Sequence, residues 1–362
     1  MAMAPAAACP SAVAVALLTG VLLLGCSRAV NVAGAASDGL VFVRQTPSGT
    51  DLFRARLSDG AIERLTRTPG RNEDWPDWSD RAGRLAFLSG PAGGSPTWDL
   101  LVWSAARRDQ AAVFVQGRSE YFLDWSPAAP LLAYSHQTGA GDFVVAQIDV
   151  ANGTRQQLAS ASGGAFLARP SFSFDGRRLV AQRIEGGLSQ LLILAPGEPP
   201  RRVLETSAYD DHGRFTRDDA WIAFDRRSSR HAPADLMLVR PDGSETRNLT
   251  NSPDLDEHSP RVSPVRDELT FVSDRSGTND VYVVGYPGGE ARNLTHTPDT
   301  SEWMPQFSPD GERIVFVILP GGFRADRDRL DYGTARIAVV DREGRRLFET
   351  NGIDPDWMPA WE

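Results

Sequence analysis

Six acidic residues recur at one register of the sequence and together could attract a cation or a basic ligand. Each stands three residues before a segment that is typical of the start of a β-strand: Glu73, Glu120, Asp210, Glu257, Glu302 and Asp356. If those strands surround one axis, carboxylates about 8 Å apart repel one another by roughly 0.5–2 kcal/mol per pair. Such a ring favours a bound cation, a basic partner segment or raised carboxylate pKa values. The alternative is that each acid accepts backbone hydrogen bonds within its own loop.

Two of the five histidines fall in the same loops and are candidate metal ligands. His212 and His258 lie within one position of each other in the repeat, and each adjoins an acidic residue. Imidazole nitrogens and carboxylate oxygens bind zinc and related divalent metals, so adjacent repeats could share a site. No spaced signature such as H-E-x-x-H is present. The sequence therefore predicts exposed loop histidines and no cofactor. The alternative is a divalent cation bound by this pair of histidines.

The clearest insertion in the chain, residues 319–334, offers further candidate ligand contacts. It contains Arg324, Arg327 and Tyr332 within a stretch rich in Gly, Asp and Arg. Long loops on a rigid scaffold tend to carry function, so we expect this segment to contribute to a binding face. The alternative is a polar flap without a binding role.

These residues are spaced by an internal repeat of the form Pro-x-aromatic-Ser, followed by a tight turn and a short apolar run. Residues 78, 125, 172, 215, 262 and 307 occupy the aromatic position, and successive copies lie 43 to 47 residues apart. A steady period of this length indicates a repeat fold. Within a copy, Ser308-Pro-Asp-Gly311 suits a tight turn, and short apolar runs between turns predict β-strands with few helices.

Each copy predicts a four-stranded blade, and the chain as a whole predicts an all-β, seven-bladed β-propeller, with six blades as the alternative. The first copy, residues 40–66, has no Pro-x-aromatic strand, whereas the chain ends on Met358-Pro-Ala-Trp-Glu362 with nothing after that strand. Joined, the two ends complete one blade in a Velcro closure that removes open sheet edges. This register places Trp361 inside the blade that begins at Leu40. The loops that enter the first strands and those between the second and third strands then share the predicted working face.

The repeat resembles the WD40-like repeats of TolB-type propellers. The resemblance rests on residues 308–316, residues 273–282 and the Arg-Asn-Leu-Thr endings at 247–250 and 292–295. It covers nearly all of the chain after the first 37 residues, and it implies a propeller fold. The α/β domain that precedes the propeller in TolB is not expected, because the first strand begins soon after Cys26. Fold alone does not fix function.

The first 37 residues predict export. An apolar run over residues 11–25 is shorter than the roughly 20 residues of a membrane span but suits a signal peptide. Leu23-Leu24-Gly25-Cys26 resembles the lipobox of bacterial lipoproteins, which implies acylation of Cys26 and a membrane anchor. The predicted organisation is a signal peptide over 1–25, a linker over 26–38 and a propeller over 39–362, held in the periplasm or at the cell surface. An ordinary signal peptide or a short uncleaved anchor is the alternative, because residues 1–10 contain no Lys or Arg.

Composition narrows the function classes. The net charge is −9 without a basic stripe, which argues against nucleic acid as a partner. Cys9 and Cys26 are the only cysteines, so no disulfide framework is expected, and no G-x-S-x-G elbow is present. The sequence therefore predicts a monomeric, non-enzymatic envelope protein that binds a protein, peptide or glycan on its loop face. The alternative is a metal-assisted polysaccharide lyase or hydrolase.

Overall fold

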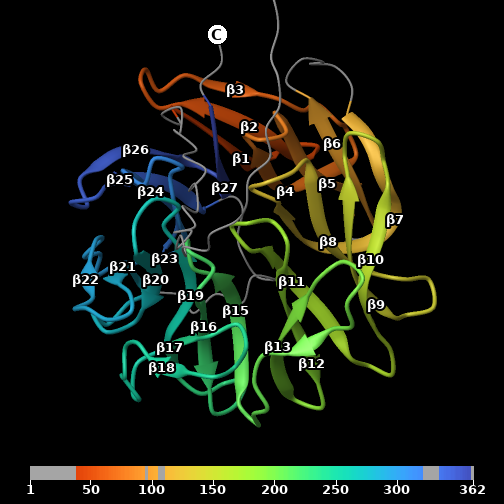
Figure 1. The fold of residues 1–362 in the computed structure, drawn as a ribbon. Coiled ribbons are helices and arrows are strands. Elements are labelled where there is room, and N and C mark those ends of the chain that lie inside the picture. Colours follow the sequence, from red (N-terminus) through yellow and green to blue (C-terminus); the bar gives the residue numbers. More distant parts are fainter. Residues whose placement is uncertain (1–37, 94–96, 105–110, 321–333, 360–362) are drawn as a thin grey trace, which may run out of the picture. The chain divides into compact units, whose positions relative to one another are not determined.

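The computed structural model describes residues 38–93, 97–104, 111–320 and 334–359, with backbone only at residues 111, 113 and 117–121. These residues belong to one compact unit that runs from Gly34 to Glu362. Every regular element within the described ranges is a β-strand. The sheets are arranged around a common axis, as Figure 1 shows, so the predicted all-β propeller is confirmed.

The strands form five hydrogen-bonded sheets. The first contains β27 (Ile353–Met358), β1 (Gly39–Thr46), β2 (Gly49–Arg56) and β3 (Ile62–Arg64). The second contains β4 (Arg71–Ser79), β5 (Arg84–Pro91), β6 (Trp98–Ser104), β7 (Ala111–Trp125), β8 (Leu131–Gln137), β9 (Phe143–Asp149) and β10 (Arg155–Ala161).

The third sheet contains β11 (Phe166–Phe172), β12 (Leu179–Glu185), β13 (Leu188–Leu194), β14 (Arg201–Arg202), β15 (Tyr209–Phe215), β16 (Ile222–Arg227), β17 (Ala234–Val239) and β18 (Thr246–Asn248). The fourth contains β19 (Glu257–Val262), β20 (Glu268–Ser273), β21 (Asp280–Gly285) and β22 (Arg292–Asn293). The fifth contains β23 (Thr300–Phe307), β24 (Arg313–Pro320), β25 (Arg336–Asp341) and β26 (Arg346–Asn351).

The structure has five sheets, whereas the sequence predicts seven or six separate blades, and two of the five sheets contain more than four strands. Strand β7 is 15 residues long, and it pairs with β6 through its first half and with β8 through its second half. A single parallel bridge between Ser189 and Tyr209 joins β13 to β15. Each feature merges two consecutive groups of strands into one continuous sheet.

The last strand, β27, pairs antiparallel with β1, so that Leu40 lies opposite Trp357 and Val41 opposite Asp356. The chain's end therefore completes its first sheet, but in a register four residues earlier than the sequence analysis predicts. Pro355 and Trp357 occupy the proline and aromatic positions of the repeat, whereas Trp361 lies outside the described residues. Asp356 consequently stands between these two positions rather than three residues ahead of a strand, which corrects its predicted place among the six acids.

The apolar core lies between neighbouring sheets. Second strands carry a run of fully buried side chains, including Phe42, Phe224, Phe271 and Phe316. One cluster joins residues of β1, β24, β25 and β27, so the two ends of the chain share a core. Full burial of a large apolar side chain contributes roughly 1.5–3 kcal/mol. These contacts fix the first strand of each repeat against its neighbours.

Candidate functional site

The first strands of the repeats form the innermost layer, and they position the candidate site. In order these are β27, β4, the second half of β7, β11, β15, β19 and β23, and consecutive members contact one another. A hydrogen bond from the Gln306 amide to Asp356 Oδ1, at 2.8 Å, links β23 back to β27. Figure 1 shows β27, β4, β11, β15, β19 and β23 towards the centre of the ring of sheets.

The residue between the proline and aromatic positions of each first strand faces the axis, and we name this set the axial ring. Asp124 on β7 reaches Arg214 on β15 at 3.5 Å, a contact that passes the intervening β11. Such a contact requires both side chains to lie towards the centre. The axial ring consists of Asp77, Asp124, Ser171, Arg214, Arg261, Gln306 and Asp356.

Part of the axial ring ties adjacent sheets together. Asp356 Oδ2 accepts the Trp78 backbone N–H at 2.6 Å, and Asp124 Oδ2 accepts the Phe172 N–H at 2.7 Å. In the reverse direction, the Trp357 indole N–H donates to the Gln306 carbonyl at 3.2 Å. These acids therefore satisfy backbone donors of the next first strand.

Charge is divided unevenly around the axial ring. Burial raises the pKa of Asp356 to about 6. Burial, reinforced by Asp356 and Asp124, raises the pKa of Asp77 well above its usual range. Burial lowers the pKa of Arg214, and the nearby Arg169 lowers it further. Acids come from β27, β4 and β7, while the arginines come from β15 and β19.

A second set of axial residues, which we name the axial belt, stands immediately before the proline position. Six of its members have φ between 46° and 57°, in the left-handed region. A β-bulge accompanies the position in six of the repeats and re-aims the side chain there, whereas on β7 the register shifts just before Phe122. The axial belt consists of Trp75, Phe122, Arg169, His212, Ser259, Met304 and Asp354; all but Phe122 have this positive φ.

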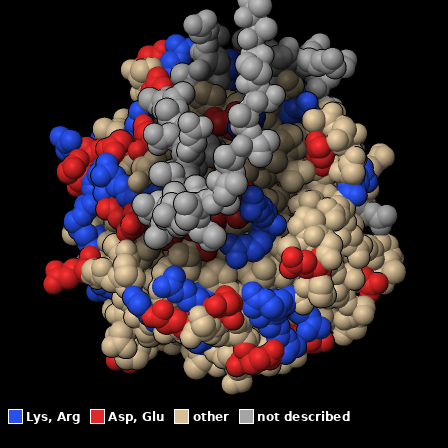
Figure 2. Space-filling view, viewed as in Figure 1, with Lys and Arg blue, Asp and Glu red and all other residues tan. Residues whose placement is uncertain are grey.

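Neighbouring members of the axial belt touch. The rings of Trp75 and Phe122 meet edge to face with centroids 4.9 Å apart. The Arg169 guanidinium lies over the Phe122 ring at 4.6 Å, and its Nε is 3.4 Å from Asp211 Oδ1. Figure 2, viewed from the same side as Figure 1, shows basic side chains near the centre of the molecule with acidic side chains beside them. The axial belt thus combines aromatic, cationic and anionic groups.

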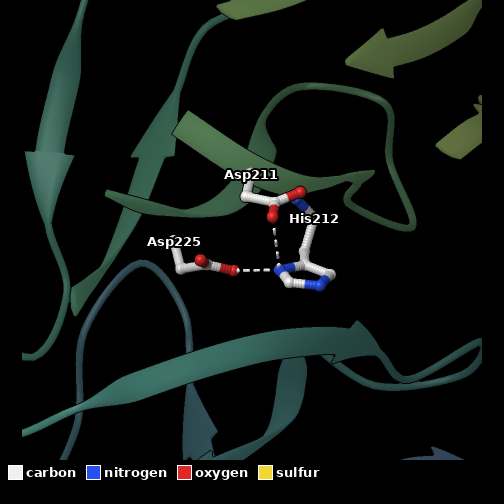
Figure 3. A group of neighbouring side chains, drawn as sticks. All are labelled: Asp211, His212 and Asp225. Atoms are coloured by element: carbon white, nitrogen blue, oxygen red, sulfur yellow. Dashed lines mark hydrogen bonds and ion pairs between the residues drawn. The ribbon is translucent and has the colours of Figure 1, made fainter. Parts of the chain in front are cut away.

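His212 lies between two carboxylates, as Figure 3 shows. Its Nδ1 is 2.7 Å from Asp225 Oδ1 and 3.7 Å from Asp211 Oδ2. Asp225 is fully buried and also accepts the Ser259 N–H at 3.2 Å. Burial alone would raise the pKa of Asp225, but the charge and hydrogen bond of His212 hold it well below its ordinary value. An imidazole bonded to a carboxylate through Nδ1 keeps Nε2 for a ligand.

Within the described residues, Asp211, His212 and Asp225 are the one group of three side chains that could hold a metal ion, with ligand atoms within 4.8 Å of one another. Two arginines already pair with these carboxylates: Arg169 with Asp211, and Arg227 with Asp225 at 3.5 Å. Their charge opposes a cation at this point.

The predicted partner His258 is buried beside this group. It stacks on Trp303 with centroids 5.1 Å apart, and its Nδ1 is 3.1 Å from Ser259 Oγ. Burial lowers the pKa of His258 to about 4. Asp225 is not among the predicted site residues, although it stands at the end of the apolar run Ile222-Ala-Phe, which was a usable signal.

The predicted acids do not gather at the mouth of the axis. Glu73, Asp210, Glu257 and Glu302 are all at most 1% exposed. Glu73 accepts hydroxyl hydrogen bonds from Thr68 at 2.5 Å and Ser89 at 3.2 Å, while Arg226 pairs with both oxygens of Asp210 at 2.7 and 2.8 Å. The hydrogen-bond partners of these four carboxylates are side-chain hydroxyl groups and arginines, not the backbone N–H groups of the alternative role.

Several predicted residues lie outside what the structure describes: Cys26, Arg324, Arg327, Tyr332 and the side chain of Glu120. Among the described residues there is no helix long and apolar enough to cross a membrane.

Comparison with known proteins shows which solved structures have a similar fold. No family model and no curated protein matches the sequence. The chain is similar to the solved structure of TolB from Acinetobacter baumannii, at 17% identity and a TM-score of 0.56, over 89% of this chain and 83% of that chain. It is similar to the β-propeller domain of the Trilobed protease from Pyrococcus furiosus, at 11% identity and 0.63, over 86% and 95%. An oligogalacturonate lyase in complex with manganese matches at 17% and 0.57, over 84% and 83%. The chain therefore has the fold of the TolB-type β-propellers that its repeat resembles.

Proposed function

We propose that this protein is a non-enzymatic binding protein of the cell envelope, which holds a protein, peptide or glycan ligand at its axial belt. Its export rests on the apolar run over residues 11–25, and its membrane anchor rests on Cys26, as a lipobox requires. The organisation we propose is a signal peptide over 1–25, a linker over 26–38 and a propeller over 39–362.

We also infer seven blades closed by β27. The axial-belt position occurs once in each of β27, β4, β7, β11, β15, β19 and β23, and each of these strands pairs antiparallel with a following or, for β27, a preceding strand. On this count the seven-stranded and eight-stranded sheets hold two blades each.

The axial belt carries the proposal because its residue types are not those that the fold requires. In a repeat protein, residues needed by the fold recur, as proline does at the next position. The axial belt instead has a different residue in every repeat. A left-handed conformation costs an L-residue roughly 1–2 kcal/mol, and glycine would avoid that cost. Six side chains kept at such positions indicate a role in binding rather than in folding.

Replacing Met304 by glycine should therefore separate stability from binding. We expect the free energy of unfolding to change by no more than about 1 kcal/mol, because relief of the strained φ of 54° offsets lost packing. Captured material from membrane extracts should decrease when this variant replaces the wild-type chain as bait. Trp75→Gly should lose capture in the same way.

The matched control is His296→Gly. His296 has a φ of 50° but is an exposed loop residue outside the axial belt. Wild type and control should capture the same molecules, detected by mass spectrometry and glycan analysis. Identical capture by all four proteins would contradict binding at the axial belt.

A metal-assisted lyase or hydrolase acting on a sugar polymer is the second candidate, favoured by the group Asp211, His212 and Asp225. A divalent metal there would bind one imidazole nitrogen and two carboxylates. On this alternative, protein purified without chelator should contain stoichiometric manganese or zinc, and Asp225→Asn should lose it. If elemental analysis finds less than about a tenth of an equivalent of metal per protein chain, the metal-assisted enzyme is rejected.

A further inference from the structure

We propose that Arg169 of the axial belt and Arg214 of the axial ring together form a site for a single carboxylate group, with the Phe122 ring beside Arg169. This inference rests on the proposed function, because it names the chemistry of the ligand that the axial belt would hold.

The two guanidinium groups have few partners within the described residues. Arg169 contacts Asp211 at 3.4 Å, and Arg214 contacts Asp124 at 3.5 Å. Both distances are at the outer limit of a hydrogen bond. Nε of Arg214 is buried and has no hydrogen-bond partner among the described residues. Because a guanidinium group carries five N–H donors, most of this capacity has no partner among the described residues.

The neighbouring acids are committed elsewhere. Asp124 accepts the Phe172 backbone N–H at 2.7 Å, and Asp211 accepts the His212 backbone N–H at 2.7 Å. Arg169 and Arg214 are close enough that the charge of one lowers the pKa of the other. A bound anion would offset this repulsion and would supply the short, charge-assisted hydrogen bonds that the present contacts lack.

The surroundings favour a monocarboxylate with an apolar group attached. A planar carboxylate matches the guanidinium fork, whereas a dianion would be repelled by Asp124 across the axis. Phe122 lies under Arg169, and Trp75 packs against Phe122. Atoms next to the bound carboxylate would therefore contact aromatic rings, which suits an apolar side chain or ring.

The test uses the full chain and two probes of nearly equal shape, 3-phenylpropanoate and 3-phenylpropanamide, titrated by calorimetry. We expect the carboxylate to bind with a dissociation constant in the millimolar range and the amide to bind at least about 10-fold more weakly. A tripeptide ending in a free carboxy-terminal phenylalanine, compared with its amide, distinguishes a peptide terminus from a small acid as the source. Inorganic phosphate should compete weakly.

Arg169→Met should abolish the preference for carboxylate over amide, and Arg214→Met should do the same. The Arg214 side chain is 21% exposed and that of Arg169 is 33% exposed, so Arg169→Met decides the outcome if Arg214→Met misfolds. Arg178→Met is the matched control, since Arg178 lies over Phe215 at 5.1 Å but away from the axial belt.

Equal binding of the two probes, no binding of either, or an unchanged preference in Arg169→Met would overturn the carboxylate site. These outcomes differ from failure of the proposed function, which is judged by capture with Met304→Gly. If the protein shows no preference for carboxylate but capture still depends on the axial belt, only the proposed ligand class is wrong. If the carboxylate binds but capture does not depend on the axial belt, only the proposed function is wrong.

Discussion

Replacing Trp357 by alanine is expected to lower the free energy of unfolding by about 3–5 kcal/mol. Trp357 is 3% exposed and belongs to the cluster that joins β1, β24 and β25. Its indole N–H also donates to the Gln306 carbonyl of the preceding first strand. The substitution therefore removes a large packed ring at the point where the last strand meets the first, and it leaves a carbonyl without its donor.

Urea unfolding of wild type, Trp357→Ala and Trp357→Phe measures this effect. Phenylalanine retains most of the packing, so it should recover more than half of the loss. Trp361→Ala tests the register, because the sequence pattern assigns the aromatic position to Trp361 instead. If the loss followed Trp361 and spared Trp357, the pairing of Leu40 with Trp357 would be wrong.

This ambiguity shows where sequence reasoning reaches its limit. The chain ends in two overlapping candidates, Pro355-Asp-Trp357 and Pro359-Ala-Trp361, and both fit the Pro-x-aromatic pattern. Only pairing with β1 chooses between them. The left-handed residue Asp354 before Pro355 matches Ser259 before Pro260, but a β-bulge has no residue type that would reveal it in the sequence. The fold itself was predictable because its prolines, turns and apolar runs recur.

The candidate site was less predictable for the opposite reason. Acids such as Glu73 were predicted as site residues because they recur in the repeats. Residues that recur in this way are the ones that serve the fold. Their partners, for example Arg226 beside Asp210, come from other strands and were not visible in the repeat pattern. The axial belt lacks a shared residue type and so produced no signal. Asp225 reaches His212 only because β16 pairs with β15.

Glu302 is expected to make the protein less stable as the pH rises from about 4.5 to about 7. Burial raises the pKa of Glu302 from 4.5 to about 7, and the neighbouring Asp280 also acts in that direction. Thr297 lies 2.6 Å from Glu302 and 2.9 Å from Asp280, yet its single hydroxyl proton can serve only one of them. A proton on Glu302 resolves this competition, since Glu302 can then donate to the Thr297 hydroxyl.

The direction of this change in stability with pH follows from proton linkage. The folded state binds the Glu302 proton more tightly than the unfolded state, so the stabilisation is complete below about pH 4.5 and is lost by about pH 7. A difference of this size corresponds to roughly 3 kcal/mol. In Glu302→Gln a neutral amide replaces the carboxyl group, and its NH₂ can donate to Asp280. The variant should therefore gain roughly 3 kcal/mol relative to wild type between pH 4.5 and pH 8.

Urea unfolding of both proteins at pH 4.5 and pH 8 measures how the stability difference between them changes with pH. His258, whose pKa of about 4 makes stability fall as the pH drops from 6.5 to 4, is present in both proteins and cancels. Glu343→Gln, at an exposed turn residue, is the matched control and should run parallel to wild type. Parallel curves for Glu302→Gln as well would show that the buried carboxyl group is ionised across this range. Thr297 and Thr300 would then donate to Glu302, while Ser276 and Asn293 donate to Asp280.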